Sequence, residues 1–321
     1  MPYSGPALSL RKPKVIELPR LGERISYIYL EYSQVHQDST GVIATQGEGK
    51  NKETLVIPIA SIGFLLMGPG TSISTPAAIS LHRAGTIVIF SSLGGATGFA
   101  AATPLTGRGE WAHAQARAWA NLESRLSIAR VFYERQFPEL NFEPNTPLQV
   151  LRGLEGSQVR ALYKTLSVKA KMPSWKREST SDKQTDAVNP LLNLGSAILY
   201  GAATSAVSAL GLNSALGFIH SGAMGALLFD LADIHKPHSS IPLAFRFCKY
   251  DKPAPMFRAA MREYLYEEKV LEGMLTLLVE VLTPYLDSHS KEDTLITDDT
   301  TAVPGHQNHS GMVDKSSSGN E

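Results

Sequence analysis

Asp230 and Asp233 end a stretch of 43 residues, from Ala187 to Phe229, that contains no Asp, Glu, Lys or Arg. On a helix, residues three apart share a face, so the two carboxylates would point the same way. His220 lies in the same stretch, a short distance before Asp230. Two carboxylates and one imidazole suit Mg²⁺ or Mn²⁺ acting on phosphate, because hard oxygen ligands leave coordination positions open for substrate oxygens and water. Zinc is disfavoured because no paired cysteines or close histidine pair accompany these residues.

Glu155 is a third candidate, since it lies between Gly153 and Gly156. Each glycine in a helix interior costs about 1 kcal/mol relative to alanine, so the glycines indicate a backbone set for close approach. Each candidate also has a structural explanation. Glu155 could be a helix-start acid favoured by the helix dipole, His220 a hydrogen-bonded core histidine, and the two aspartates a capped or salt-bridged helix end.

Several other classes of site are excluded by the sequence. It contains no phosphate-binding loop, dinucleotide-binding glycine fingerprint, nucleophile elbow or paired-cysteine zinc motif. Cys248 is the single cysteine, which excludes an intrachain disulfide. No apolar run typical of a signal peptide follows the N-terminal basic residues. We therefore expect a cytoplasmic protein.

The charge balance differs between the body of the chain and its end. The 321 residues hold 30 Lys and Arg against 30 Asp and Glu, but residues 287–321 contain seven of the acids and only two lysines. This end also has few large apolar residues, so we expect it to be disordered. The remaining body leans basic, which suits a polyanionic partner but equally fits scatter around neutrality.

The apolar pattern changes along the chain from strand-like to helical. Short β-branched runs separated by turn residues predict five or six strands in the first quarter, with a short helix from Pro76 to Arg83. From Trp111 a helical period runs toward Gln136. The predicted fold is α+β, an N-terminal β-strand domain followed by a larger all-α catalytic domain. We predict boundaries at 1–107, 108–286 and 287–321.

The later part of the chain is predicted to be helical throughout. Ser157 to Lys169 has helical periodicity, Leu191 to Ala209 and Leu212 to Ile234 indicate a buried helical hairpin, and Pro255 to Leu286 indicates closing helices. The uncharged stretch is long enough to span a membrane. Its frequent Asn, Ser and Thr, and its excess of Gly and Ala over Leu, favour close packing inside a core, so we predict no membrane association.

Three segments, taken in order, resemble a known family. Residues Leu151–Arg160, Gly217–Gly222 and Phe229–Asp233 closely resemble the three active-site motifs of the CRISPR adaptation integrase, the larger of the two core adaptation proteins. Their order and intervals are also similar. Leu30–Gln34 and Met67–Thr71 resemble the subtype I-E branch of that family.

The resemblance implies a site, a reaction and partners. Glu155, His220 and Asp233 would correspond to the ligands of Mg²⁺ or Mn²⁺, and Asp230 to a neighbouring acid that supports them. The implied reaction is transesterification, in which the 3′-hydroxyl of a captured double-stranded DNA fragment attacks a phosphodiester at the CRISPR repeat. The implied assembly is a homodimer that pairs with the small second adaptation protein.

Three further residues match family positions that contact DNA. Tyr32 would stack on the end of the fragment duplex, although a tyrosine on a strand face is an equal interpretation. Arg258 and Arg262, one helical turn apart, would contact phosphates or simply form a solvated face. Two rival functions stay open at this point. One is a stand-alone metal-dependent nuclease acting on branched DNA in repair, and the other is a catalytically dead DNA-binding scaffold.

Overall fold

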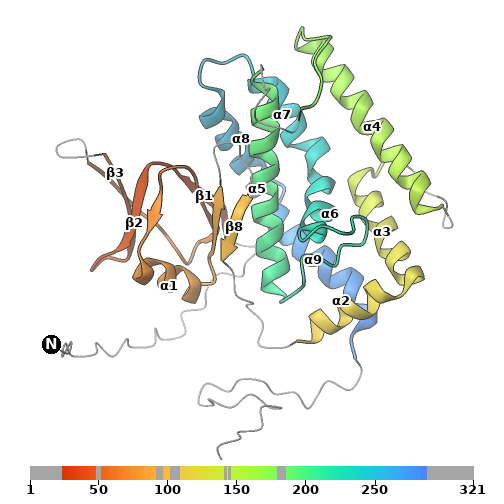
Figure 1. Cartoon of the computed structure of the whole chain (residues 1–321), viewed down its shortest axis with the longest axis horizontal. Coiled ribbons are helices and arrows are strands. Elements are labelled where there is room, and N and C mark those ends of the chain that lie inside the picture. The colour runs from red at the N-terminus through yellow and green to blue at the C-terminus, as the bar shows by residue number, and fades with distance from the viewer. Residues whose placement is uncertain are drawn as a thin grey trace, which may run out of the picture. The chain divides into compact units, whose positions relative to one another are not determined.

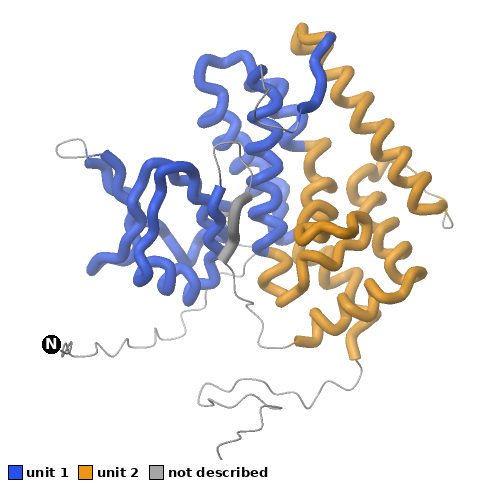
Figure 2. Tube along the Cα trace, in the orientation of Figure 1, with its two compact units in different colours: residues 1–102, 174–205, 239–273 blue, residues 103–173, 206–238, 274–321 orange. Residues whose placement is uncertain are grey.

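The computed structural model describes residues 24–47, 52–91, 97–101, 109–140, 143, 146–178 and 186–287 (Figure 1). The chain forms two compact units, coloured separately in Figure 2. Unit 1 comprises residues 1–102, 174–205 and 239–273, and unit 2 comprises residues 103–173, 206–238 and 274–321. The acidic end that we predict to be disordered lies outside the described residues, except for Asp287.

Unit 1 contains two four-stranded sheets. The first has the order β1-β5-β7-β8, with β1 (Ile25–Leu30), β5 (Ile62–Met67) and β7 (Ile87–Ser91) parallel and β8 (Thr97–Ala101) antiparallel. The second has the order β4-β3-β2-β6, formed by β4 (Glu53–Val56), β3 (Val42–Gln46), β2 (Ser33–Gln37) and β6 (Ser72–Ile73). The N-terminal β-strand region of the predicted fold class is thereby confirmed.

The core of unit 1 explains the sequence of β5. All six residues of this strand are buried, in agreement with its unbroken apolar run. Leu65 and Met67 join a cluster with Val35 and Val42 of the other sheet and with Leu81 of helix α1 (Thr75–Arg83). Phe64, also fully buried, instead contacts Gly201 of α5 (Val188–Ala209).

The remaining regular elements of the described chain are helices, as the predicted fold class requires. They are α2 (Glu110–Ala120), α3 (Leu122–Gln136), α4 (Leu148–Lys169), α5, α6 (Ala226–His235), α7 (Ser240–Phe247), α8 (Pro253–Glu267) and α9 (Val270–Leu282), with 3₁₀ turns at Lys236–His238 and Thr283–Tyr285. Unit 1 holds α7, α8 and α5 up to Ser205, whereas unit 2 holds α2, α3, α4 and α6. Because each unit combines separate stretches of chain, the sequential boundaries 1–107, 108–286 and 287–321 stay a prediction.

Several predicted elements differ from the structure. The described residues form eight strands where five or six were predicted, and the helix expected from Trp111 to Gln136 is two helices. The break falls at Asn121, whose side-chain oxygen accepts a hydrogen bond from the Ser124 amide at 2.9 Å and so caps α3. Helix α4 runs from Leu148 to Lys169, so it contains the segment predicted from Ser157 to Lys169 and places Glu155 inside a continuous helix.

The predicted helix from Leu212 to Ile234 is wrong in its first half. Residues 212–225 form a loop, and α6 begins only at Ala226. Gly211 and Gly222 have φ angles of +66° and +83°, in the left-handed region that other residues rarely adopt, so they interrupt the helix. The glycines beside Glu155 are not required by close packing within the chain, because a Cβ added at Gly153 would meet nothing within 4 Å.

Helix α5 is the one described helix that is long and apolar enough to cross a membrane by length and composition. Its most apolar window is 67% buried. Close packing explains this burial within unit 1, since Gly195 lies against Ser240 and Phe257, and Gly201 lies against Phe64. Its small residues therefore serve the close approach of neighbouring elements, as the sequence indicates.

The packing of Gly201 predicts opposite effects of one substitution at two sites. A Cβ at Gly201 would lie 2.6 Å from the Phe64 ring, whereas a Cβ at Gly273 of α9 would meet nothing within 4 Å. Both Gly→Ala changes gain about 1 kcal/mol of helix propensity, but Gly201→Ala also overpacks the core at a cost of about 1–3 kcal/mol. We expect urea unfolding to place Gly201→Ala below Gly273→Ala by that amount. Equal stabilities would contradict this packing.

Candidate active site

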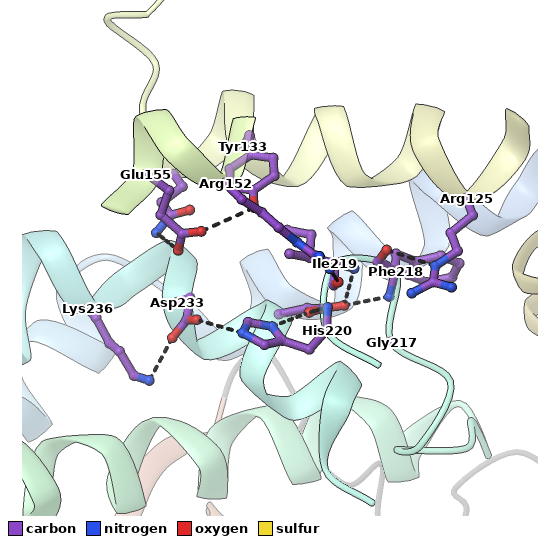
Figure 3. A network of polar contacts seen from close by, with 12 residues as sticks. Arg125, Tyr133, Arg152, Glu155, Gly217, Phe218, Ile219, His220, Asp233 and Lys236 are labelled. Carbon is purple, nitrogen blue, oxygen red and sulfur yellow. Dashed lines mark hydrogen bonds and ion pairs between the residues drawn. The ribbon is translucent and has the colours of Figure 1, made fainter. Parts of the chain in front are cut away.

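The Asp230 carboxylate in α6 is buried within unit 2 and forms several hydrogen bonds there. It is 1% exposed. Its Oδ2 accepts hydrogen bonds from the backbone amides of Phe218 (2.6 Å) and Ile219 (3.0 Å), and its Oδ1 accepts one from the amide of His220 (2.8 Å). Oδ1 also lies 2.7 Å from Nδ1 of the His220 ring (Figure 3). Asp230 therefore organises the backbone before His220 as well as its side chain.

The contact with Asp230 determines which nitrogen of His220 is available. An ionised carboxylate can only accept hydrogen bonds, so Nδ1 carries the proton that it shares with Asp230. In the neutral ring, Nε2 then presents a lone pair, which is the arrangement found in carboxylate–histidine–metal sites. The His220 side chain is 40% exposed while that of Asp230 is fully buried. The inner nitrogen of the ring, Nδ1, is thus fixed, and the outer nitrogen, Nε2, is accessible.

Asp233 lies next to the outer nitrogen. Its Oδ2 is 3.7 Å from His220 Nε2, and its Oδ1 is 2.6 Å from the Lys236 ammonium. Figure 3 shows this row of side chains along one side of the site. The i,i+3 spacing of Asp230 and Asp233 on α6 places one carboxylate behind the imidazole and the other in front of it.

Glu155 reaches the same place from α4. Its Oε2 accepts a hydrogen bond from the Tyr133 hydroxyl (3.1 Å), and its Oε1 accepts one from Gln136 Nε2 (3.2 Å), both on α3. Burial raises the pKa of the Glu155 carboxyl, and the charge of Asp233 raises it further, while the two hydrogen bonds act in the opposite direction. The like charges of Glu155 and Asp233 therefore act on each other.

The electrostatic state of His220 is consistent with this cluster. The hydrogen bond to Asp230 raises the pKa of the His220 imidazole, burial opposes this, and the charges of Asp230, Asp233 and Glu155 raise it further. The raised pKa favours a proton on Nε2 when no cation is bound, and that proton would balance part of the surrounding negative charge. A divalent cation and that proton would compete for the same position.

The donor set fits a divalent cation, although its side chains are not gathered around one point. Among the described residues, no group of three or more His, Cys, Asp or Glu has the spacing of a formed metal site. Glu155, Asp233 and His220 Nε2 nevertheless offer two hard oxygen donors and one imidazole, a combination that suits Mg²⁺ or Mn²⁺. Burial is the main cause of the raised pKa of Glu155 and the charge of Asp233 adds to it, and a bound cation would offset both.

The other predicted site residues lie in unit 1. Tyr32 has a φ of +50°, its amide donates to the Pro69 carbonyl at 2.8 Å, and its side chain is 62% exposed. The Arg258 guanidinium lies 4.2 Å from the Tyr29 ring centre and 3.7 Å from the Glu31 carboxylate, with 15% of its side chain exposed. Much of Arg258 is therefore used within unit 1.

Arg262, the second predicted basic contact, lies on the exposed side of α8. Its guanidinium is 5.8 Å from the ring centre of Tyr27, a cation–π distance. The structure thus brings Glu155, His220, Asp230 and Asp233 together within unit 2. The proposed DNA contacts of Tyr32, Arg258 and Arg262 stay predictions.

Sequence reasoning missed the residues that hold the site in place. Tyr133 and Gln136 lie 22 and 19 residues before Glu155, so no local spacing indicates that they bond to it. Lys236 did have a signal, because it follows Asp233 at i+3 on the same helical path, a spacing that allows an ion pair.

A histidine oriented by a buried carboxylate, facing two further carboxylates in a helical unit, is typical of enzymes that use a divalent cation on phosphate esters. The sequence signature of the family described as CRISPR associated protein Cas1 matches residues 136–276, which include all four candidate residues. The chain belongs to the Cas1 family.

Relatives and solved structures agree with this assignment. The CRISPR-associated endonuclease Cas1 2 of Thermus thermophilus is 34% identical over 273 residues, 84% of this chain and 82% of that protein. The CRISPR-associated endonuclease Cas1 of Clostridium sp. strain SY8519 is 34% identical over 71% of this chain and 75% of that protein. The crystal structure of the TtCas1–DNA complex matches with a TM-score of 0.74 and 30% identity, covering 86% of this chain and 98% of that chain.

The bonds to Asp230 predict that its substitution harms folding more than the same change at Asp233. In Asp230→Asn, an amide nitrogen replaces one acceptor oxygen, which leaves two buried N–H donors facing a donor. Each unsatisfied donor costs about 1–3 kcal/mol, so we expect a loss of at least about 2 kcal/mol. Asp233→Asn loses a partly exposed ion pair worth up to about 1 kcal/mol.

The comparison should be made by urea unfolding in the presence of EDTA. A shift of the unfolding midpoint that is the same for both variants would contradict the central role of Asp230.

The raised pKa of Glu155 predicts that Glu155→Gln stabilises the metal-free protein at neutral and alkaline pH. The folded state holds the Glu155 proton more tightly than the unfolded chain does. Ionisation therefore lowers stability as the pH rises from the unfolded value through the folded one. The gain from Glu155→Gln should be present at pH 8 and smaller at pH 5.

Thermal unfolding with EDTA at both pH values checks this expectation. Adding Mn²⁺ should reverse the order of the two proteins, since the variant lacks one oxygen donor charge. A pH-independent difference in Tm would show that Glu155 ionisation does not affect stability.

Proposed function

We propose that this protein is a metal-dependent integrase and endonuclease of CRISPR adaptation. It joins the 3′-hydroxyl ends of captured DNA fragments to the repeat array. The observation that carries the proposal is that Glu155 and Asp233 act on each other beside the outer nitrogen of His220, with the ring oriented by Asp230, in a chain of the Cas1 family.

The chemistry follows from the charges that develop on phosphate. The fragment's 3′-oxygen forms a bond to phosphorus as the bond from phosphorus to the repeat strand's 3′-oxygen breaks. The attacking hydroxyl loses a proton and the leaving oxygen gains one. A bound Mg²⁺ or Mn²⁺ would lower the pKa of the hydroxyl and neutralise charge on the phosphate. One phosphodiester replaces another, so the exchange needs no nucleotide hydrolysis.

The protein's own residues supply position and charge. Glu155 and Asp233 would hold the cation with His220 Nε2, while Asp230 keeps the imidazole in the tautomer that can bind it. Lys236, at 2.6 Å from Asp233, places a positive charge at the edge of the site. Tyr133 and Gln136 keep the Glu155 carboxylate directed toward the cluster.

The finer proposals concern subtype, partners and location. We assign the chain to the I-E branch, with Leu30–Gln34 and Met67–Thr71 as the supporting segments. It would act in the cytoplasm as a homodimer with the small second adaptation protein. Its DNA partners would be double-stranded fragments and the CRISPR repeat. The exposed Tyr32 ring would stack on the fragment end, and Arg258 and Arg262 would contact phosphates.

The proposal predicts that Glu155→Ala and His220→Ala each abolish strand transfer while the protein stays folded. The purified chain, with and without the small adaptation protein, is incubated with a 3′-hydroxyl duplex and a supercoiled plasmid carrying a leader and repeat, in Mn²⁺ or EDTA. We expect covalent fragment–plasmid product only with metal and partner, and a loss of at least about 100-fold in both variants.

Matched controls are Glu280→Ala and His82→Ala, which remove an exposed acid on α9 and an exposed histidine on α1. Both should retain full activity. Partner-independent cleavage without joining would indicate a repair nuclease. DNA binding without product in the wild-type protein would indicate a scaffold, and unchanged joining in both site variants would overturn the assigned site.

A further inference from the structure

The segment from Asn213 to His220 has no helix or strand, yet side chains bind most of its backbone polar groups. A loop that carries a catalytic group would normally be among the more mobile parts of a protein. Here the side chains come from helices α2, α3, α4 and α6, all within unit 2. This arrangement needs a reason, because two of those side chains, Gln115 and Asp230, are themselves withdrawn from water.

Gln115 of α2 binds the beginning of the loop. Its side chain is completely buried. Its Nε2 donates to the carbonyls of Asn213 (2.8 Å) and Leu216 (3.1 Å), and its Oε1 accepts from the amide of Asn213 (2.8 Å). One amide group thus closes three hydrogen bonds on a turn of backbone.

The next carbonyls of the loop are bound in sequence. Trp119 of α2 donates from Nε1 to the Gly217 carbonyl at 3.1 Å, and Arg125 of α3 donates from Nε to the Phe218 carbonyl at 3.0 Å. The Arg125 guanidinium also lies 5.5 Å from the Trp119 ring centre. A Cβ at Gly217 would lie 2.7 Å from the backbone of Ala226, so the loop is held against the start of α6.

The other side of the loop is fixed by α4 and α6. Arg152 donates to the Ile219 carbonyl, while Asp230 accepts the amides of Phe218, Ile219 and His220. Carbonyls are therefore bound by α2, α3 and α4, while the amide at the start of the loop is bound by α2 and the three amides at its end by α6. A backbone held on both sides cannot slide or rotate without breaking buried or part-buried hydrogen bonds, and the buried ones are costly to leave unmade.

We propose that Gln115, assisted by Trp119, is a positioning residue for His220. Gln115 fixes the position of the start of the loop, and the hydrogen bonds to the following carbonyls extend that position as far as Ile219. His220 Nε2 is consequently held toward Glu155 and Asp233 in the orientation that binds the cation. The catalytic consequence rests on the proposed metal-dependent reaction, while the positioning role itself rests only on the hydrogen bonds.

The main test is Gln115→Met, which keeps the volume of the side chain but removes both donors and the acceptor. In the full chain, calorimetry without DNA should show Mn²⁺ affinity reduced by about 10- to 100-fold, the usual effect of removing a residue that orients a ligand. The kcat for strand transfer should fall while the KM for DNA stays unchanged. Trp119→Phe, which removes one N–H but keeps the ring, should change both quantities in the same direction by a smaller factor.

A control separates positioning from general loss of stability. Leu278→Ala removes a fully buried side chain of α9 in unit 2. It should lower the Tm but leave Mn²⁺ affinity unchanged. Nitrogen-15 spectra of the His220 ring in the metal-free protein at pH 8 give a second readout. Gln115→Met should change the balance of the two ring tautomers, and Leu278→Ala should not.

Positioning is overturned if Gln115→Met keeps the Mn²⁺ affinity and ring spectrum of the wild-type protein. It stands, even if the wild-type protein joins no DNA, when the variant loses affinity and its ring spectrum changes. A wild-type protein that joins no DNA overturns only the proposed integrase function and leaves the positioning role intact. If the wild-type protein joins DNA but Gln115→Met binds Mn²⁺ normally, the function stands and the positioning role is wrong.

Discussion

The buried carboxylate of Asp230 is the interaction on which the site depends. It forms hydrogen bonds with three backbone amides and with Nδ1 of His220. Because Asp230 and Asp233 occupy one face of α6, the bond that orients the imidazole also fixes its distance from Asp233. A single buried charge therefore determines the geometry of two of the three cation donors. Charge-assisted hydrogen bonds of this kind are the strong ones, since the acceptor is ionised.

Helix α3 connects this half of the site with the other. Tyr133 and Gln136 near its end hold Glu155, while Arg125 near its beginning holds the Phe218 carbonyl in the loop before His220. The Phe132 ring packs edge-on against Phe218 with centres 6.0 Å apart, which anchors α3 on that same loop. Glu155 on α4 and the loop before His220 thus share one supporting helix, which fixes their positions relative to each other.

Local pattern predicted part of this arrangement. The i,i+3 spacing of Asp230 and Asp233 and the unbroken apolar run of β5 could be read directly, because each depends on neighbours in sequence. The loop before His220 could not, since its partner Gln115 lies 98 residues away and its apolar residues resemble those of a buried helix. The glycines beside Glu155 were misleading for the opposite reason. They suggested close approach, whereas α4 simply continues through them with open space at Gly153.

The electrostatic free-energy cost of the site is concentrated at Glu155. Lys236 offsets the charge of Asp233, and the hydrogen bond to Asp230 together with the surrounding carboxylates raises the pKa of His220, which favours a balancing proton on its ring. The carboxylate oxygens of Glu155 accept hydrogen bonds from the neutral side chains of Tyr133 and Gln136. These dipoles solvate the charge of Glu155 but do not neutralise it. Burial and Asp233 both raise the pKa of Glu155 as a result. The negative charge with least compensation is therefore on α4, and a cation entering the cluster gains most by approaching Glu155. Holding that charge in place without a cation requires the rigid support that α3 supplies, because a mobile carboxylate would turn toward water and the donor set would be lost.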